Sequence, residues 1–396
     1  MRSGKGAVTG DMAIKLSCCG ALLIGLVLTL AACGGEGVAT GATWAGTVDT
    51  VEGVRVVSSP AEPLLSAAES WRLEEQLSIG VVEGDPDYQF GGIAAVEVDA
   101  KGNIYVADQQ ARRVAIYDST GVFQLAFGRQ GEGPGEFEAP NRLLWKGDTL
   151  VAWDPRLLRL SYFDRQGNLL RDERAELQTY NRLALRPDGM FWVQRGPMYY
   201  WPIRPGVGGI GHIVVADVAE ESADTVLSWE DQSTIPVRFE NGLTVVPRRY
   251  APRTQWTTDA EGRLFVAAGD EYEIDVYDMD GERIAAIRRE HTRQPPSAAE
   301  RDSALAWLEE NAERYGPNAD KVRKAFEIAE LKSATGELLI SDDGYLWVRV
   351  FDEDVLAKQT WDVFDPEWRY LTSVTLPPTL EVHRVTRDKL YGEMED

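Results

Sequence analysis

The chain has little cysteine and little histidine, and this shortage removes several kinds of chemistry. All three cysteines, Cys18, Cys19 and Cys33, fall within the first 33 of 396 residues. The rest of the chain therefore has no disulfide and no thiol nucleophile. The three histidines are far apart, so no pair has the spacing of a zinc site. No Gly-x-Ser-x-Gly string is present either, which argues against an α/β-hydrolase nucleophile.

Positive charge is also in short supply. Lysine and arginine number 41 against 64 aspartate and glutamate residues, giving a formal net charge of −23 at pH 7. Such acidity supports solubility and works against nucleic acid or an anionic membrane surface as a partner. We expect no nucleic-acid binding, and we expect a monomer.

The N-terminal region has the pattern of an export segment. An apolar run from Ala21 to Ala32 follows Lys15 and is shorter than the roughly 20 residues that a membrane-spanning helix needs. The run ends in Leu30-Ala31-Ala32-Cys33, which is the lipobox pattern. We expect cleavage before Cys33 and lipidation of its side chain, so that residues 1–33 lie outside the fold. An ordinary secretion signal is the alternative, and the start can be Met1 or Met12.

Residues 34–43 are mostly Gly, Ala and Thr and are expected to form a flexible tether. The folded part would then hang from a bacterial membrane by its lipid anchor alone. It would face the periplasm or the cell exterior. The sequence does not distinguish the inner from the outer membrane.

A short phrase recurs four times, with an aromatic residue, Asp and usually a Gly three residues later. The copies begin at Tyr117, Phe163, Tyr277 and Phe364. A Gly turn and an alternating apolar run precede each copy, as expected for β-strands. We expect the repeated Asp to accept hydrogen bonds from turn amides. Repetition at this scale is typical of β-propellers and solenoids.

These phrases resemble the NHL-repeat type of six-bladed β-propeller, in particular a bacterial lipoprotein group. The closest match runs from Val96 to Phe137, with Gly131-Glu-Gly-Pro-Gly-Glu-Phe137 at its end. The resemblance implies an all-β, six-bladed propeller over residues 44–396. It implies no fixed activity, because propellers carry lyases, lactonases and pure binding modules.

Counting strands predicts five complete blades and a composite sixth. The five lie near residues 92–128, 139–172, 180–229, 246–290 and 331–377. The sixth is expected to join 380–385 and 389–394 at the C-terminus to 47–57 and 71–80 near the N-terminus. Pairing both chain ends in one blade would remove the open edges of the sheet.

A helical insertion of about 297–331 is predicted between blades four and five. Ser297 and Glu300 form a capping-box pattern, and apolar residues follow at helical spacing. All long insertions fall in the connections that share one face of the disc. Long loops on a rigid scaffold usually carry binding sites, so this face is the predicted binding face. The alternative is that the insertions only cover the channel mouth.

Two groups of side chains on this face are candidate ligand contacts. Tyr199, Tyr200 and Trp201, with Arg204, would stack against a planar group, or else fold back as a small core. Arg248, Arg249 and Arg253 are a basic island in an acidic chain. They would bind an anionic group, or else pair with neighbouring carboxylates.

The preferred function is a binding or scaffold module for a protein, peptide or glycan, without catalytic residues or a cofactor. The alternative is a calcium-dependent, lactonase-like hydrolase or a lyase that uses the central channel. That activity would need carboxylates converging on the ion, and no calcium motif supports it. Asp278-Met-Asp280-Gly281 lacks the other ligands of a calcium loop.

Overall fold

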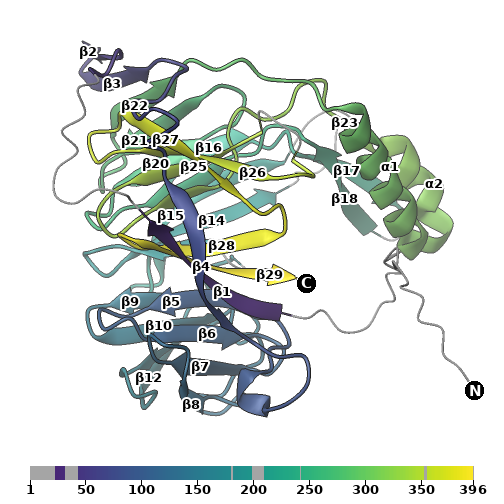
Figure 1. Ribbon diagram of the computed structural model, residues 1–396. Helices are drawn as coiled ribbons and strands as arrows, with labels where there is room; N and C mark the ends of the chain where they lie inside the picture. The colour runs from purple at the N-terminus through teal and green to yellow at the C-terminus, as the bar shows by residue number, and fades with distance from the viewer. Residues whose placement is uncertain are drawn as a thin grey trace, which may run out of the picture.

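A computed structural model describes residues 23–31, 43–179, 182–198, 209–240, 242–351 and 355–395. The chain forms an all-β, six-bladed β-propeller with a helical insertion, which confirms the predicted fold class (Figure 1). Each blade contains four antiparallel strands, and the first strands of the blades lie around a central channel. Within the described residues, none of the helices is both long enough and apolar enough to span a bilayer.

Five blades are built from consecutive strands. Blade one holds β5 (Ile93–Val98), β6 (Ile104–Asp108), β7 (Arg113–Tyr117) and β8 (Phe123–Phe127). Blade two holds β9 (Arg142–Lys146), β10 (Thr149–Asp154), β11 (Arg159–Phe163) and β12 (Leu169–Arg174). Blade three holds β13 (Leu183–Leu185), β14 (Phe191–Met198), β15 (Ile210–Asp217) and β16 (Ser222–Glu230). Blade four holds β19 (Gln255–Thr258), β20 (Leu264–Ala267), β21 (Glu273–Tyr277) and β22 (Arg283–Arg289). Blade five holds β24 (Leu338–Ile340), β25 (Leu346–Val350), β26 (Gln359–Phe364) and β27 (Tyr370–Leu376).

Blade six joins the two ends of the chain. Its order is β28 (Leu380–Val385), β29 (Lys389–Glu395), β1 (Leu23–Ala31) and β4 (Arg72–Ile79). The apolar segment expected to be removed by export therefore lies, in this structure of the whole chain, between β29 and β4. A short 3-10 helix, η1 (Pro86–Tyr88), then leads into blade one.

The prediction that residues 47–57 complete blade six is wrong. β2 (Thr47–Val51) and β3 (Val54–Ser59) form a hairpin instead, and β3 pairs in parallel with β22. Blade four thereby becomes a six-stranded sheet. The reason is packing: Val57 is fully buried in an apolar cluster with Ala285 and Ile287 of β22.

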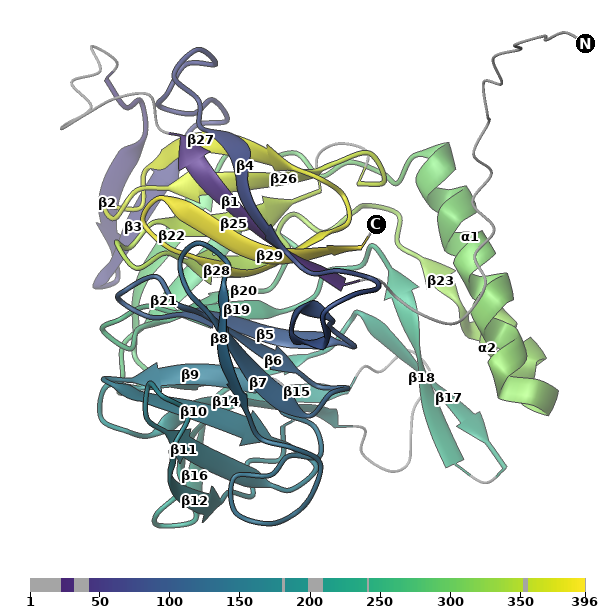
Figure 2. The ribbon, with the colours of Figure 1, turned by 60° about the horizontal axis from the view of Figure 1, so that its bottom comes forward.

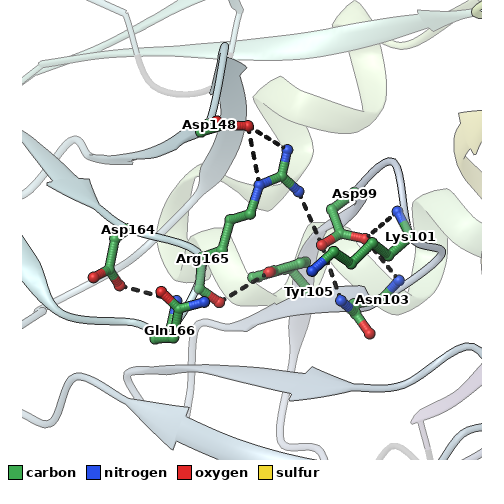
Figure 3. A network of polar contacts seen from close by, with 8 residues as sticks. All are labelled: Asp99, Lys101, Asn103, Tyr105, Asp148, Asp164, Arg165 and Gln166. Carbon is green, nitrogen blue, oxygen red and sulfur yellow. Dashed lines mark hydrogen bonds and ion pairs between the residues drawn. The ribbon is translucent and has the colours of Figure 1, made fainter.

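The tight turns on one face are stabilised by aspartate carboxylates, which accept hydrogen bonds from turn amides as predicted for the repeated Asp. In blade one, Asp99 accepts a 2.9 Å hydrogen bond from the amide of Asn103 and forms a 2.9 Å ion pair with Arg165 of blade two (Figure 3). Arg165 also pairs with Asp148 at 2.8 Å, and its carbonyl accepts from the hydroxyl of Tyr105. The network therefore joins two blades. Five other turns use an Asp in the same way, at Asp118, Asp164, Asp259, Asp278 and Asp365.

The opposite face carries a raised structure that we call the wall. It consists of the hairpin β17 (Thr234–Phe239) and β18 (Gly242–Arg249), the helices α1 (Ala298–Ala312), η2 (Glu313–Asn318) and α2 (Ala319–Ala325), and the short strand β23 (Glu327–Ile328). Figures 1 and 2 show these elements together at one side of the sheets. They share an apolar core that includes Val246, Leu308 and Val322.

The wall differs from the sequence prediction in two places. The second helix ends at Ala325 rather than near Leu331, because Phe326 is extended and Glu327–Ile328 pair with β18. Residues 246–249 belong to β18 rather than to blade four, whose first strand begins at Gln255. The predicted capping box is present, with hydrogen bonds in both directions between Ser297 and Glu300.

A buried ion pair attaches the wall to the disc. Glu300 is fully buried and accepts 3.1 Å contacts from the ammonium of Lys332 and from the amide of Val355. The Glu300 carbonyl also accepts from the hydroxyl of Tyr250 at 3.0 Å. Because removal of one partner would leave a buried charge uncompensated, this link fixes the wall firmly.

Ring closure makes the outer strand of blade six important for stability. Ile79 of β4 is buried in a cluster with Phe90, Ile93 and Tyr391, which belong to both sides of the seam. We expect Ile79→Ala to lower the free energy of unfolding by about 2–4 kcal/mol, because it leaves a cavity there. Chemical denaturation monitored by circular dichroism measures this change. Val82→Ala, at a site 57% exposed, is the matched control and should cost little. Equal free energies of unfolding for the two variants would contradict a stabilising role for Ile79 at the seam.

The turn carboxylates predict how the fold responds to acid. Burial acts to raise the pKa of Asp99, but hydrogen bonds from Asn103, the Lys101 amide and Arg165 outweigh it and lower the pKa. A lowered folded-state pKa means that this stabilisation is present at neutral pH and is lost as the pH falls through that pKa. We expect Asp99→Asn to melt below the wild type at pH 7, with the difference shrinking below about pH 4. A difference in melting temperature that is constant with pH would contradict the assignment.

Candidate functional site

The strongest candidate site is a cavity of about 570 Å³ between the wall and the channel mouth. We call it the mouth. Five arginines line it, and Glu337 is its only lining carboxylate among the described residues. The five are Arg182, Arg248, Arg249, Arg253 and Arg349. A chain with a large negative charge thus gathers positive charge at one place.

The arginines arrive from separate parts of the fold. Arg248 and Arg249 end β18 in the wall, and Arg253 lies in the link just before β19. Arg182 directly precedes the first strand of blade three, and Arg349 lies on β25 of blade five. The sequence analysis predicted the first three and missed Arg182 and Arg349. A position next to a predicted first strand is the signal that could have found Arg182, since Arg253 has a similar place.

Two of the predicted arginines have structural partners. Arg248 forms a 3.1 Å ion pair with Glu327 of β23. The guanidinium of Arg249 lies 5.2 Å from the ring centroid of Trp307 in α1, a cation–π contact. The alternative of structural pairing therefore describes much of what these two side chains do. They hold the wall and also contribute charge to the mouth.

Arg253 and Arg349 are different. Within the described part of the chain, neither has a carboxylate oxygen within ion-pair distance. Arg253 is exposed, and Arg349 is half-buried beside the ring of Phe351 at 5.5 Å. A guanidinium without a carboxylate partner keeps its planar set of donors for a carboxylate or phosphate.

Arg182 and Glu337 stand where the mouth meets the channel, since both line both cavities. The guanidinium of Arg182 donates a 2.7 Å hydrogen bond to the side chain of Gln255. Burial, with repulsion from Arg142 and Arg253, lowers the pKa of Arg182 to about 10, although Glu337 opposes this change. Arg182 is still charged at neutral pH.

The carboxyl group of Glu337 is shifted in the opposite sense. Burial raises its pKa above the ordinary value, while Arg182 and Arg349 act against the shift. A raised carboxyl pKa means that Glu337 takes up a proton at a higher pH than an exposed glutamate does. The negative charge in the mouth therefore depends on pH.

The channel below the mouth is a second cavity of about 450 Å³. First strands of all six blades contribute to its lining, and Asn141, Arg142, Glu381 and His383 lie among the lining residues. Arg384 follows His383 in the chain but is not a lining residue. Its Nε lies 3.8 Å from a carboxylate oxygen of Glu97, and it also forms an ion pair with Asp342. The channel is thus polar and carries both signs of charge.

A third cavity of about 420 Å³ continues the mouth along blade three, between Arg253 and Pro197. The predicted aromatic cluster, Tyr199, Tyr200 and Trp201 with Arg204, comes next in the chain but lies outside the described residues. Cys33 also lies outside them. The expected roles of these residues stay predictions.

The described residues hold no group of three or more His, Cys, Asp or Glu side chains placed to bind a metal ion. This finding covers only the described ranges. The calcium-dependent alternative therefore stays a prediction, without a ligand set to carry it.

Comparison with known proteins supports the fold. Residues 82–196 match the model of a family described as 6-bladed beta-propeller, DUF5128. This stretch covers blades one and two and the first strands of blade three. None of the curated proteins matches the chain.

Solved structures similar to this chain are distant from it in sequence. A protein thought to be exported, from Bacteroides fragilis, is 13% identical with a TM-score of 0.45, over 81% of this chain and 80% of its own. A DUF4221 family member from Bacteroides vulgatus is 10% identical with a TM-score of 0.47, over 79% and 94%. Virginiamycin B lyase from Staphylococcus aureus is 11% identical with a TM-score of 0.37, over 77% and 95%. Likeness at this level carries no argument about function.

Proposed function

We propose that this propeller is an extracytoplasmic, lipid-anchored binding module that takes an anionic segment of a protein, peptide or glycan at the mouth. One observation carries the proposal. Arg253 and Arg349, which have no carboxylate partner in the described part of the chain, line one cavity with the half-buried, charged Arg182.

The chemistry of arginine favours binding over proton transfer. A guanidinium stays protonated at physiological pH and makes a poor general acid or base. It instead offers several donors in one plane, which suit two oxygens of a carboxylate or phosphate. A cluster of such groups on a rigid ring is organised before the ligand arrives, which lowers the cost of binding.

The anchor follows from the pattern at Cys33. The lipobox predicts a diacylated N-terminus, and two acyl chains suffice for stable attachment to a membrane. The tether of residues 34–43 would then place the propeller near the membrane in an oxidising compartment. A folded part without cysteine suits that location.

Removal of one guanidinium from the mouth should weaken anion binding. We expect Arg253→Met and Arg349→Met each to weaken the binding of a tetramethylrhodamine-labelled hexaglutamate peptide by about tenfold, the loss of roughly one charge-assisted contact. Fluorescence anisotropy with the full chain in detergent measures the dissociation constant. Arg174→Met removes the same charge from an exposed pair with Glu176 on blade two and should leave the affinity unchanged.

A uniform loss in all three variants would indicate nonspecific charge attraction and would contradict a site at the mouth. Melting temperatures separate binding from folding, because Arg253 is exposed and its replacement should leave the fold intact. An oligogalacturonate of equal charge, measured in parallel, distinguishes a peptide from a glycan ligand.

Glu337 makes the affinity depend on pH. Because its pKa is raised, a fall in pH protonates Glu337 before it protonates the exposed glutamates of the probe. The repulsion between Glu337 and the bound anion then disappears. We expect the hexaglutamate affinity to rise as the pH falls through the raised pKa of Glu337 and the rise to vanish in Glu337→Gln. An identical pH profile in that variant would show that Glu337 is not the titrating group.

A further inference from the structure

The channel prefers the opposite kind of ligand group from the mouth above it. Asn141 is only 7% exposed, lines the channel, and has a side-chain oxygen without a hydrogen-bond partner in the described part of the chain. A buried acceptor without a donor is costly, so a ligand that supplies one is favoured. Glu381 lines the same cavity and is exposed within it.

The balance of charge favours a cation in the channel over one in the mouth. Two carboxylates, Glu337 and Glu381, line the channel against two guanidiniums, Arg142 and Arg182. Arg384 is occupied by Glu97 and Asp342, and His383 lies 3.6 Å from Glu393. The charged groups that line the channel therefore balance before a ligand binds, whereas five arginines face one carboxylate in the mouth.

We propose that the ligand of this site is a peptide segment with a free ammonium group as well as a carboxylate. The carboxylate binds at Arg253 and Arg349 in the mouth. The ammonium enters the channel, where Glu381 and the oxygen of Asn141 accept its hydrogens. An ammonium group offers three donors and no acceptor, which matches this set. The inference rests on the proposed function and specifies the class of ligand.

Arg182 and Glu337 favour one orientation of the ligand, with its carboxylate in the mouth and its ammonium in the channel. They form the boundary between the cavities, with the arginine fixed by Gln255 and the glutamate beside it. A ligand that entered in the reverse orientation would place its carboxylate near Glu381 and its ammonium among the arginines. Like charges would then meet at both ends, which disfavours that orientation.

A series of simple probes tests the proposal. Linear ω-amino acids, diacids and diamines of four to ten carbons are titrated into the full chain by calorimetry. At one chain length we expect the amino acid to bind at least tenfold more tightly than the diacid and the diamine. Glu381→Gln should weaken binding of the amino acid about tenfold and leave the affinity for the diacid unchanged or slightly higher.

Controls separate this proposal from the one on which it rests. Glu367→Gln removes the same charge from an exposed residue on the tight-turn face and should change nothing. If Arg253→Met weakens the diacid but Glu381→Gln leaves the amino acid unchanged, the channel assignment is overturned and the mouth stands. If the Arg253→Met variant binds the diacids as tightly as the wild type does, anion binding at the mouth is overturned, and this inference is overturned with it. Equal affinity for amino acid and diacid at every length also overturns it.

Proton release gives a second readout. A cation near Glu337 stabilises the ionised carboxylate and an anion near it stabilises the protonated form, so binding of the amino acid should release more protons than binding of the diacid of the same length. Calorimetry in two buffers with different ionisation enthalpies measures that release. Equal proton release or uptake for the amino acid and the diacid would contradict an ammonium in the channel.

Discussion

The whole molecule depends on closure of the ring at blade six. Five blades are continuous in sequence, but the sixth takes its two inner strands, β28 and β29, from the C-terminus and its two outer strands, β1 and β4, from segments near the N-terminus. Apolar side chains of β4 face both ways from the seam: Leu73 packs with blades five and six, and Ile79 packs with blade one. Since an open sheet would expose unpaired edges, this junction sets the stability of the entire scaffold. The position of every mouth residue follows from it.

A second constraint places the wall beside the channel. Two helices and a hairpin with their own small core could lie in many orientations on a flexible linker. The buried pair of Glu300 and Lys332 removes that freedom, because separating the two charges would leave each without compensation. Glu300 is also the N3 residue of the capping box that begins α1, whose N-cap is Ser297. One carboxylate thus starts the helix and positions it over the mouth.

Local features of the fold could be predicted from the sequence because they depend on neighbouring residues. The turn aspartates and the Ser297–Glu300 capping box act within four residues, so a short pattern contains all of their information. The placement of residues 47–57 could not be predicted in this way. An alternating strand pattern shows that one face is buried, but it does not show which free sheet edge accepts the strand. Burial of Val57 against β22 decides that point.

The candidate site shows the same division. Arg248, Arg249 and Arg253 are close in sequence and were recognised as a basic island. Arg182 and Arg349 stand alone in sequence and reach the mouth only because the ring brings blades three and five together. Of the two arginines without a carboxylate partner in the described part of the chain, Arg253 belongs to the basic island and Arg349 is one of the isolated residues. A cluster assembled by topology leaves no local signal, whatever its importance.

Net charge and local charge act on a ligand over different distances. At physiological ionic strength the Debye length is about 8 Å, so acidic residues on the far surfaces of the disc are largely screened at the mouth. They slow the approach of an anion and favour ligands whose net charge is small. Within the mouth, Arg182 and Arg349 are half-buried, so their charges are screened much less. A ligand with one carboxylate and one ammonium meets both conditions, since it approaches without strong repulsion and still presents an anion to the arginines.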